Sequence, residues 1–445
     1  MRARRPLPTR PAPPASRLAL FAALALGLGG GAWYGLSRPQ NPPVQAAAQA
    51  RTVAGDWEAL RAFGPRPVGE EGHERAVDWL AGQFRALGYR VNEQPVTVER
   101  PFDRGGTLRI GALSVPAAAL YGSRGGEQAG RLVRLPAGAT AERMEALGLR
   151  AQLALTTCRD WEDTEWSELV GRALRAGALG LVLVQDCEVP QPQRVPATPL
   201  PLVSVSAADG ARVLARAGQP AELSSQVEVR EVTGRNLIAA RVEAAPQIVF
   251  GAHLDSVNGS PGANDNASGV LAVLDAARGA AGTELAGRAW FVLFDAEEDG
   301  LHGSRAFVDA HRFALRQTRA MLNFDMVGVS AEALGVAAHA ELRPLARAVR
   351  PGVRVFEDDP PGRETFGRSS GVTGSSDHVP FMAWGVRTAF IHRGLDDGYH
   401  APSDRTLSPA LVQEASRFGT RLAEAALAAP WTPDEPCEGF RSEGC

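Results

Sequence analysis

The stretch "FGAHLDSVNGSPGANDNASG", residues 250–269, extends an apolar run, "QIVF", into a histidine and two aspartates. The apolar run predicts a buried strand, and the following "NASGVLAVLDAARGAA" predicts a helix. His253, Asp255 and Asp265 therefore fall at the carboxyl end of a strand. Charged groups at such a position must be paired or must bind a ligand.

Further strands and helices alternate outward from this stretch. Strands are predicted at "NLIAARV", "RAWFVLFDAEE", "AMLNFDMVG" and "RTAFIHRG", and a long helix at "SPALVQEASRFGTRLAEAALAA". Strands rich in Val, Ile, Leu and Phe that alternate with helices predict an α/β fold, with a mostly parallel central sheet covered by helices on both faces.

The segment 106–228 has a different character. It contains short apolar strands, one predicted helix, many prolines and no histidine. We expect a small inserted α/β domain without metal chemistry, which divides the main domain into residues 52–105 and 229–430.

Composition narrows the choice of partners. The chain has 445 residues, enough for two or three domains, and its hydrophobic (44%) and charged (22%) fractions are ordinary for a globular protein. The net charge of −3 leaves no polybasic footprint, so nucleic acid is not expected as a partner. The oligomeric state stays open.

The N-terminus predicts a targeting segment. Residues 1–17 are basic and proline-rich, residues 18–36 are apolar and uncharged, and residues 37–51 form a linker. A bilayer span needs about 20 apolar residues, and the preceding arginines favour a cytoplasmic N-terminus. We expect a single-pass membrane anchor with the catalytic domain on the periplasmic or extracellular side. The alternative is a cleaved signal peptide and a secreted protein.

Four cysteines, an even number, allow disulfides in an exported chain. Cys158 and Cys187 end two apolar runs, which neighbouring strands would bring close together. Cys437 and Cys445 lie in the C-terminal tail, 431–445, and could tie it down. Four free thiols are the alternative, and the spacing excludes a Cys-rich zinc site.

A set of metal-binding residue types recurs at the predicted strand ends. Glu297 and Glu298 follow "WFVLFDA", Asp325 follows "AMLNF", and His400 comes shortly after "TAFIH". The carboxyl ends of strands in an open parallel sheet meet at one edge, where ligands bind. These residues are therefore expected to converge with His253.

Four carboxylates in one cleft would repel one another and raise their pKa values, and two divalent cations would remove this conflict. Histidine and carboxylate are good zinc ligands, and two metals need a bridging group. The prediction is two zinc ions per chain bridged by Asp265. One ion is held by His253 and Asp325, the other by Glu298 and His400. Glu297 is left as general base.

The ordered motifs "HLDS", "GANDNASG", "FDAEEDGLHGS", "NFDMVG", "SDHVPF" and "YHAPSD" resemble the dizinc exopeptidases, which include bacterial leucyl aminopeptidases and glutamate carboxypeptidase. The resemblance extends to "FGPRPVGEEGHERAVDWL" near the start of the domain. It implies the same ligand set and base. It also implies that Asp255 orients His253, that Asp404 does so for His400, and that 106–228 resembles a protease-associated domain.

Other histidines compete for the last ligand position. His392 lies at the end of the "TAFIH" strand and His378 lies in "SDHVPF". The family pattern favours His400, and Asp377 and His378 are then supporting residues near the site.

These features predict a zinc-dependent aminopeptidase that hydrolyses peptides next to a free N-terminus. Three alternatives remain: a glutaminyl-peptide cyclase, a carboxypeptidase of the same fold, and a receptor-like member without catalysis.

Overall fold

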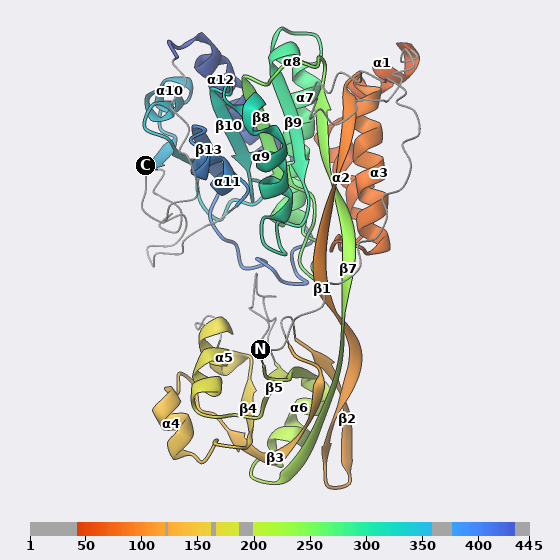
Figure 1. Cartoon of the computed structure of the whole chain (residues 1–445), viewed down its shortest axis with the longest axis vertical. Helices are drawn as coiled ribbons and strands as arrows, with labels where there is room; N and C mark the ends of the chain where they lie inside the picture. Colours follow the sequence, from red (N-terminus) through yellow and green to blue (C-terminus); the bar gives the residue numbers. More distant parts are fainter. Residues whose placement is uncertain (1–41, 121–122, 162–165, 187–198, 358–375, 432–445) are drawn as a thin grey trace, which may run out of the picture. The chain divides into compact units, whose positions relative to one another are not determined.

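The structure is a computed structural model that describes residues 42–120, 123–161, 166–186, 199–357 and 376–431. All statements below refer to these residues. The chain forms helices and strands in alternation, as the sequence predicted, around a large sheet (Figure 1).

Eight strands make up the part of the sheet whose strand ends carry the predicted site residues. They are β1 (Arg90–Ile110), β7 (Pro220–Ala240), β8 (Ile248–His253), β9 (Ala289–Phe294), β10 (Ala320–Phe324), β11 (Gly335–Ala338), β12 (Arg354–Glu357) and β13 (Thr388–His392). Their order is β1-β7-β9-β8-β10-β13-β11-β12. The three innermost strands β8, β9 and β10 are fully buried along their length, which agrees with their unbroken apolar sequences.

The sheet is mixed, which corrects the expectation of a mostly parallel one. Strands β9, β8, β10 and β13 run parallel to their neighbours. At the two borders of this group, β7 pairs with β9 and β11 pairs with β13 in antiparallel fashion. Strand β7 runs in the opposite direction because it is the return arm of a long antiparallel ribbon with β1. The parallel centre nevertheless places four carboxyl ends at one edge.

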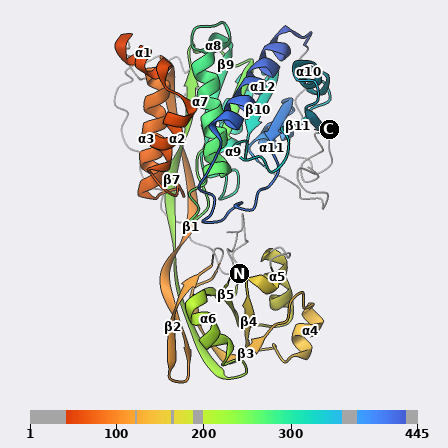
Figure 2. The same ribbon diagram turned by 180° about the vertical axis from the view of Figure 1, so that it is seen from behind.

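Helices cover both faces of this sheet, as expected (Figures 1 and 2). Alternate side chains of β8 point to opposite faces, so Phe250 packs with one group of helices and Val249 with the other. The Phe250 face is covered by α2 (Val53–Arg61), α3 (Glu71–Ala86), α7 (Gly269–Ala280), α10 (Leu342–Val349) and α12 (Pro409–Ala428). The Val249 face is covered by α9 (His302–Leu315) and α11 (His378–Ala383). Two further helices are α1 (Pro42–Ala50) and α8 (Leu285–Arg288).

The segment between β1 and β7 forms a smaller α/β arrangement with its own apolar clusters. Its elements are β2 (Leu113–Ala119), β3 (Gly126–Arg134), α4 (Ala141–Ala146), β4 (Leu153–Thr157), η1 (Arg159–Trp161), α5 (Trp166–Arg175), β5 (Gly180–Gln185), β6 (Leu202–Ser206) and α6 (Ala207–Leu214). Strands β3, β4, β5 and β6 are parallel. The division at residues 106 and 228 stays a prediction, because β1 and β7 pair on both sides of these positions, with a shift of register between Asp103 and Gly106.

The predicted membrane anchor is contradicted. Over the described part of the chain, no helix combines the length and the apolar character that a bilayer crossing requires. Helix α12 is long enough with 20 residues, but it carries Glu414, Arg417, Arg421 and Glu424. The apolar run at 18–36, on which the prediction rested, lies outside the described residues.

Candidate metal centre

The site lies where the parallel strands of the sheet end. His253 is the last residue of β8, and Asp325 directly follows β10. Asp265 lies in the turn η2 (Ala263–Ser268) that leads into α7, and its own backbone is not helical (φ −109°, ψ 91°). Glu297 and Glu298 follow β9 after a tight turn in which Ala296 has a positive φ of 55°.

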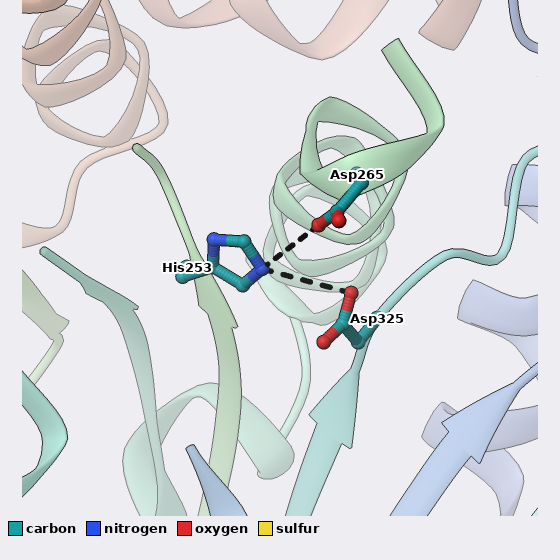
Figure 3. A group of neighbouring side chains, drawn as sticks. All are labelled: His253, Asp265 and Asp325. Carbon is teal, nitrogen blue, oxygen red and sulfur yellow. Dashed lines mark ion pairs between the residues drawn. The ribbon is translucent and has the colours of Figure 1, made fainter. Parts of the chain in front are cut away.

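Five predicted ligands come together in two groups that share one aspartate. One group is His253, Asp265 and Asp325, and the other is Asp265, Glu298 and His400. In the first, Nε2 of His253 lies 3.2 Å from Oδ1 of Asp265 and 3.6 Å from Oδ1 of Asp325 (Figure 3). In the second, Nε2 of His400 lies 3.2 Å from Oδ2 of Asp265 and 3.3 Å from Oε2 of Glu298. Each carboxylate oxygen of Asp265 therefore faces a different histidine.

The atoms that face the centre of these groups are suited to a cation. Nε2 of His253, Oδ2 of Asp265 and Oδ1 of Asp325 are buried and make no hydrogen bond to any described residue. Buried polar atoms are nearly always satisfied, so atoms left without a hydrogen bond need another partner. Imidazole nitrogen and carboxylate oxygen are the usual non-thiolate ligands of zinc. The residues present fit a zinc site.

The pKa shifts describe the same excess of negative charge. Burial alone would lower the pKa of His253, but the carboxylates of Glu297 and Asp325 outweigh it and raise this pKa well above its usual value. Burial would likewise lower the pKa of His400, which the carboxylates of Glu298 and Asp265 raise. The cluster therefore attracts positive charge, which protons supply when no metal is bound.

Glu297 is one of several buried carboxylates at the site whose pKa is raised. Its pKa is raised well above the ordinary value, chiefly by burial, and the neighbouring Glu298 and Asp377 add to the effect. His253 acts in the opposite direction. A carboxylate with a raised pKa can both accept and return a proton near neutral pH. Glu297 also lies in a third group with His253 and Glu298, so the geometry admits it as a ligand as well.

Asp255 lies where the sequence predicted and makes more contacts than expected. Its Oδ1 is 3.5 Å from Nδ1 of His253. The same carboxylate accepts hydrogen bonds of 3.1 Å from the backbone N–H groups of Glu297 and Glu298. Asp255 thus connects the His253 ring to the turn that carries Glu297 and Glu298, here called the glutamate turn.

Asp404 differs from the expectation. Instead of contacting His400, its two carboxylate oxygens accept hydrogen bonds from the backbone N–H groups of Asn264 (2.7 Å) and Asp265 (3.0 Å). The reason is the path of the loop after His400, which turns toward η2 so that the N–H of Ala263 also donates to the Asp404 carbonyl. Burial raises the pKa of Asp404 to about 7.

The remaining predicted residues lie near the groups but not in them. Asp377 precedes α11, is buried, and has its pKa raised to about 7 by burial. The His378 ring stacks on Phe390 with 4.5 Å between ring centroids. His392 accepts a hydrogen bond at Nδ1 from the Gly394 N–H, and burial lowers its pKa to about 4. Of the three competing histidines, the geometry places His400 with the ligands.

The disulfide prediction is not settled. Cys158 is buried and is not a free thiol. Cys187, Cys437 and Cys445 lie outside the described residues, so the proposed pairing stays a prediction.

Several residues at the site were not singled out from the sequence. The Tyr399 ring stacks on His400 at 3.8 Å, and burial, followed by the charges of Asp265 and Glu298, raises its pKa well above the usual value. Its hydroxyl therefore stays protonated and can donate. The only signal was an aromatic residue directly before a predicted ligand. Arg66 and His73 are also completely buried.

A mixed α/β sheet with a histidine–carboxylate cluster at the carboxyl ends of its parallel strands is typical of metal-binding enzymes. Residues 236–419 match peptidase family M28. The chain is 28% identical to aminopeptidase YwaD of Bacillus subtilis over 400 residues, which cover 85% of this chain and 84% of YwaD. It is 30% identical to the probable lipoprotein aminopeptidase LpqL of Mycobacterium tuberculosis over 59% of this chain and 55% of LpqL.

The solved structures agree on the fold. A zinc aminopeptidase from B. subtilis superimposes with a TM-score of 0.68 at 24% identity and covers 83% of this chain and 94% of its own. An M28 peptidase precursor from Shewanella amazonensis gives 0.67 at 21% identity, over 89% and 98% of the two chains. The match of residues 236–419 to peptidase family M28 and the aminopeptidase relatives confirm the predictions of a dizinc-exopeptidase relative and of a metallo-exopeptidase.

Proposed function

We propose that the chain is a zinc aminopeptidase that holds two zinc ions and removes residues from the free N-terminus of peptides. The observation that carries this proposal is the shared position of Asp265, with one carboxylate oxygen 3.2 Å from each of two histidines. His253 and Asp325 would complete one zinc site, and Glu298 and His400 the other. Both relatives named above are aminopeptidases by name, which supports the reaction type.

Bound zinc would act as a Lewis acid and would lower the pKa of water to about 7. Glu297 accepts the proton of the attacking water at a carboxylate oxygen and returns it to the leaving amine. Its burial beside Glu298 and Asp377 raises its pKa, which suits both halves of this transfer. The surrounding carboxylates are opposite in charge to the ammonium group of the substrate and would attract it. Tyr399 offers a protonated hydroxyl beside His400.

The test of the reaction is a substrate panel with and without chelator. Aminoacyl-anilides and unblocked dipeptides should be cleaved, and the N-acetylated forms should not. Chelation should abolish cleavage, and elemental analysis should find two zinc ions per chain. Cyclisation of glutaminyl peptides without hydrolysis, or release of C-terminal residues from N-blocked peptides, would assign the chain to another activity. A zinc-loaded protein that turns over none of these would be a binding member of the family.

The test of the base is Glu297→Gln, which keeps the shape of the side chain but removes the proton acceptor. We expect kcat to fall by roughly 10²–10⁴-fold while both zinc ions stay bound. Loss of zinc from this variant would make Glu297 a ligand, as its third grouping allows. Wild-type turnover would show that another group takes the proton.

A further inference from the structure

The motif "FGPRPVGEEGHERAVDWL" has so far received no role, although it lies outside residues 236–419 that match the family. The first of its two arginines, Arg66, is completely buried. An arginine almost never occupies such a position unless its charge and its donors are used. Its contacts therefore indicate what the motif does.

The guanidinium of Arg66 binds three backbone carbonyls of a single loop. Nε donates to Leu254 (2.9 Å), Nη1 to Pro261 (2.7 Å) and Nη2 to Gly262 (2.9 Å). This loop runs from the end of β8 to the start of η2. Leu254 directly follows His253, and Gly262 lies three residues before Asp265. One side chain thus holds both ends of the loop between two of the proposed zinc ligands.

The backbone of Arg66 adds to this attachment. Its N–H donates to Oγ of Ser256 (3.0 Å), and the Ser256 N–H donates to the Arg66 carbonyl (3.3 Å). Oγ of Ser256 in turn donates to the Ser260 carbonyl at 3.0 Å. The loop therefore has a fixed course, although it contains neither a helix nor a strand.

The packing around the guanidinium leaves no room for adjustment. Gly262 has a φ of +59°, and a Cβ at this position would lie 2.9 Å from Nη2 of Arg66 and 2.6 Å from Cβ of Ser256. A residue with a side chain could not keep this conformation without moving the arginine. The glycine and the arginine are therefore matched to each other.

Arg66 also lies in the electrostatic field of the site without neutralising any one ligand. Among the described residues it forms no ion pair with a carboxylate; its guanidinium donors go to carbonyl oxygens. Burial lowers its pKa, and Asp404, Asp255 and Asp265 act against this shift. The planar fork of an arginine can hold several carbonyls in fixed directions, which the single ammonium of a lysine cannot do.

From this arrangement we infer that Arg66 is a positioning residue, which fixes the loop 254–262 so that His253 and Asp265 are held ready for metal before zinc arrives. The inference rests on the zinc site of the proposed function. Groups that orient metal ligands are typically worth 10–100-fold in metal affinity or activity. The role belongs to the hydrogen bonds and not to the charge alone.

Arg66→Met tests this role, and Arg241→Met is the matched control. Arg241 also uses its guanidinium to bind two carbonyls, those of Leu87 and Ala281 at 2.8 Å each, but contacts no residue of the site. For Arg66→Met we expect a roughly 10–100-fold weaker zinc affinity, a lower kcat, and faster amide hydrogen exchange in 254–264 of the zinc-free protein. Arg241→Met should lower the melting temperature and leave zinc affinity and loop exchange unchanged.

Arg66→Lys separates position from charge. It keeps the positive charge but cannot reach three carbonyls, so it should rescue little of the loss. Full rescue by lysine, wild-type zinc affinity in Arg66→Met, or an equal loss of zinc affinity in Arg241→Met would each overturn the inference. If Arg66→Met does not fold, the lysine variant decides by the same zinc and exchange measurements. A wild-type protein that binds zinc but cleaves no peptide would refute the proposed function alone, because these two measurements do not use turnover.

Discussion

The chain contains two groups of four parallel strands, and they differ in what their carboxyl ends do. In the inserted segment, the polar residues at the ends of β5 and β6 bind nearby backbone. Asp186 accepts a hydrogen bond from the Arg159 N–H (3.0 Å), and Ser206 accepts one from the Asp209 N–H (3.2 Å). In the catalytic sheet, the histidines and carboxylates that follow the strands instead face one another around Asp265. The distances from the histidine Nε2 atoms to the carboxylate oxygens are at most 3.6 Å.

This difference shows that parallel topology alone does not make a site. Both groups offer an edge at which strand ends meet, and ligands commonly bind at such edges. The segment 106–228 has no histidine, and its polar strand ends satisfy themselves locally. At the catalytic edge, Nε2 of His253, Oδ2 of Asp265 and Oδ1 of Asp325 are buried without a hydrogen bond, whereas neither Asp186 nor Ser206 has such an atom. Function here follows from the side chains that the topology brings together.

The largest expected effect is that of Asp265→Ala, compared with Asp186→Ala at the other edge. Removing Asp265 takes one oxygen from each proposed zinc site and leaves the histidines and carboxylates without their shared partner. Both zinc ions and all measurable peptidase activity should be lost. Asp186→Ala removes one local hydrogen bond and should change neither. Elemental analysis and an aminoacyl-anilide assay on the two variants measure this difference, and full zinc occupancy in Asp265→Ala would contradict a bridging role.

A smaller effect on zinc binding and activity is expected from replacing Asp404, a side chain that accepts hydrogen bonds from backbone N–H groups. Ser206 in the inserted segment is the comparison. Asp404 accepts the N–H groups of Asn264 and Asp265, and Ser206 accepts that of Asp209. Asp404→Ala should cost roughly 10–100-fold in zinc affinity or kcat, because it frees the backbone that carries Asp265. Ser206→Ala should cost about 1 kcal/mol of stability, typical of a lost helix cap, with unchanged kcat. Equal effects of the two variants on kcat would argue against a positioning role for Asp404.

The convergence of the proposed ligands could be predicted from the sequence because they follow apolar strands. His253, Asp325 and His400 are far apart in the chain, but parallel strands end at one edge, and this rule places them together. The antiparallel borders at β7 and β11 could not be predicted in this way, because strand direction depends on connections that apolar patterns do not record.

The supporting residues could not be predicted because their partners are distant and carry no pattern. Arg66 binds carbonyls 188 to 196 residues away, and His73 binds Asp295 at a separation of 222 residues. Backbone carbonyls are present at every position, so the sequence does not show which of them an arginine will find. The expectation that Asp404 orients His400 came from the family resemblance, whereas the course of the loop brings its carboxylate to the N–H groups of Asn264 and Asp265.

Zinc removal should increase local unfolding at the edge of the catalytic sheet but not at the edge formed by β3 to β6. A ligand that binds only the folded state stabilises it by RT ln(1 + [L]/Kd), about 2.7 kcal/mol at 100 times Kd. Chelation should therefore lower the melting temperature and raise amide exchange in 254–268, where the proposed ligands His253 and Asp265 are joined. Exchange in β3 to β6 should stay the same. A uniform increase over both groups of strands would indicate that zinc stabilises the chain as a whole.

The smallest expected effect concerns the buried pair of His73 and Asp295, which lies just before the glutamate turn. Nε2 of His73 is 2.9 Å from Oδ1 of Asp295, and both side chains are fully buried. Burial alone would lower the pKa of His73, but the charge of Asp295 outweighs it and raises this pKa above 6.5. The stabilisation from this pair is therefore complete below about pH 6.5 and is lost as the pH rises through the folded-state pKa.

His73→Gln should consequently be most destabilising at low pH. The difference in free energy of unfolding between wild type and variant should shrink above about pH 6.5, by up to about 1.4 kcal/mol for each unit by which the pKa is raised. Urea unfolding of the zinc-loaded proteins between about pH 6 and pH 9 measures this difference. His311 provides the opposite sign, because burial lowers its pKa beside Trp290 and Phe307, so its contribution is lost as the pH falls below about 6.5. A difference for His73→Gln that stays constant with pH would mean that the pair is held by its hydrogen bond and not by charge.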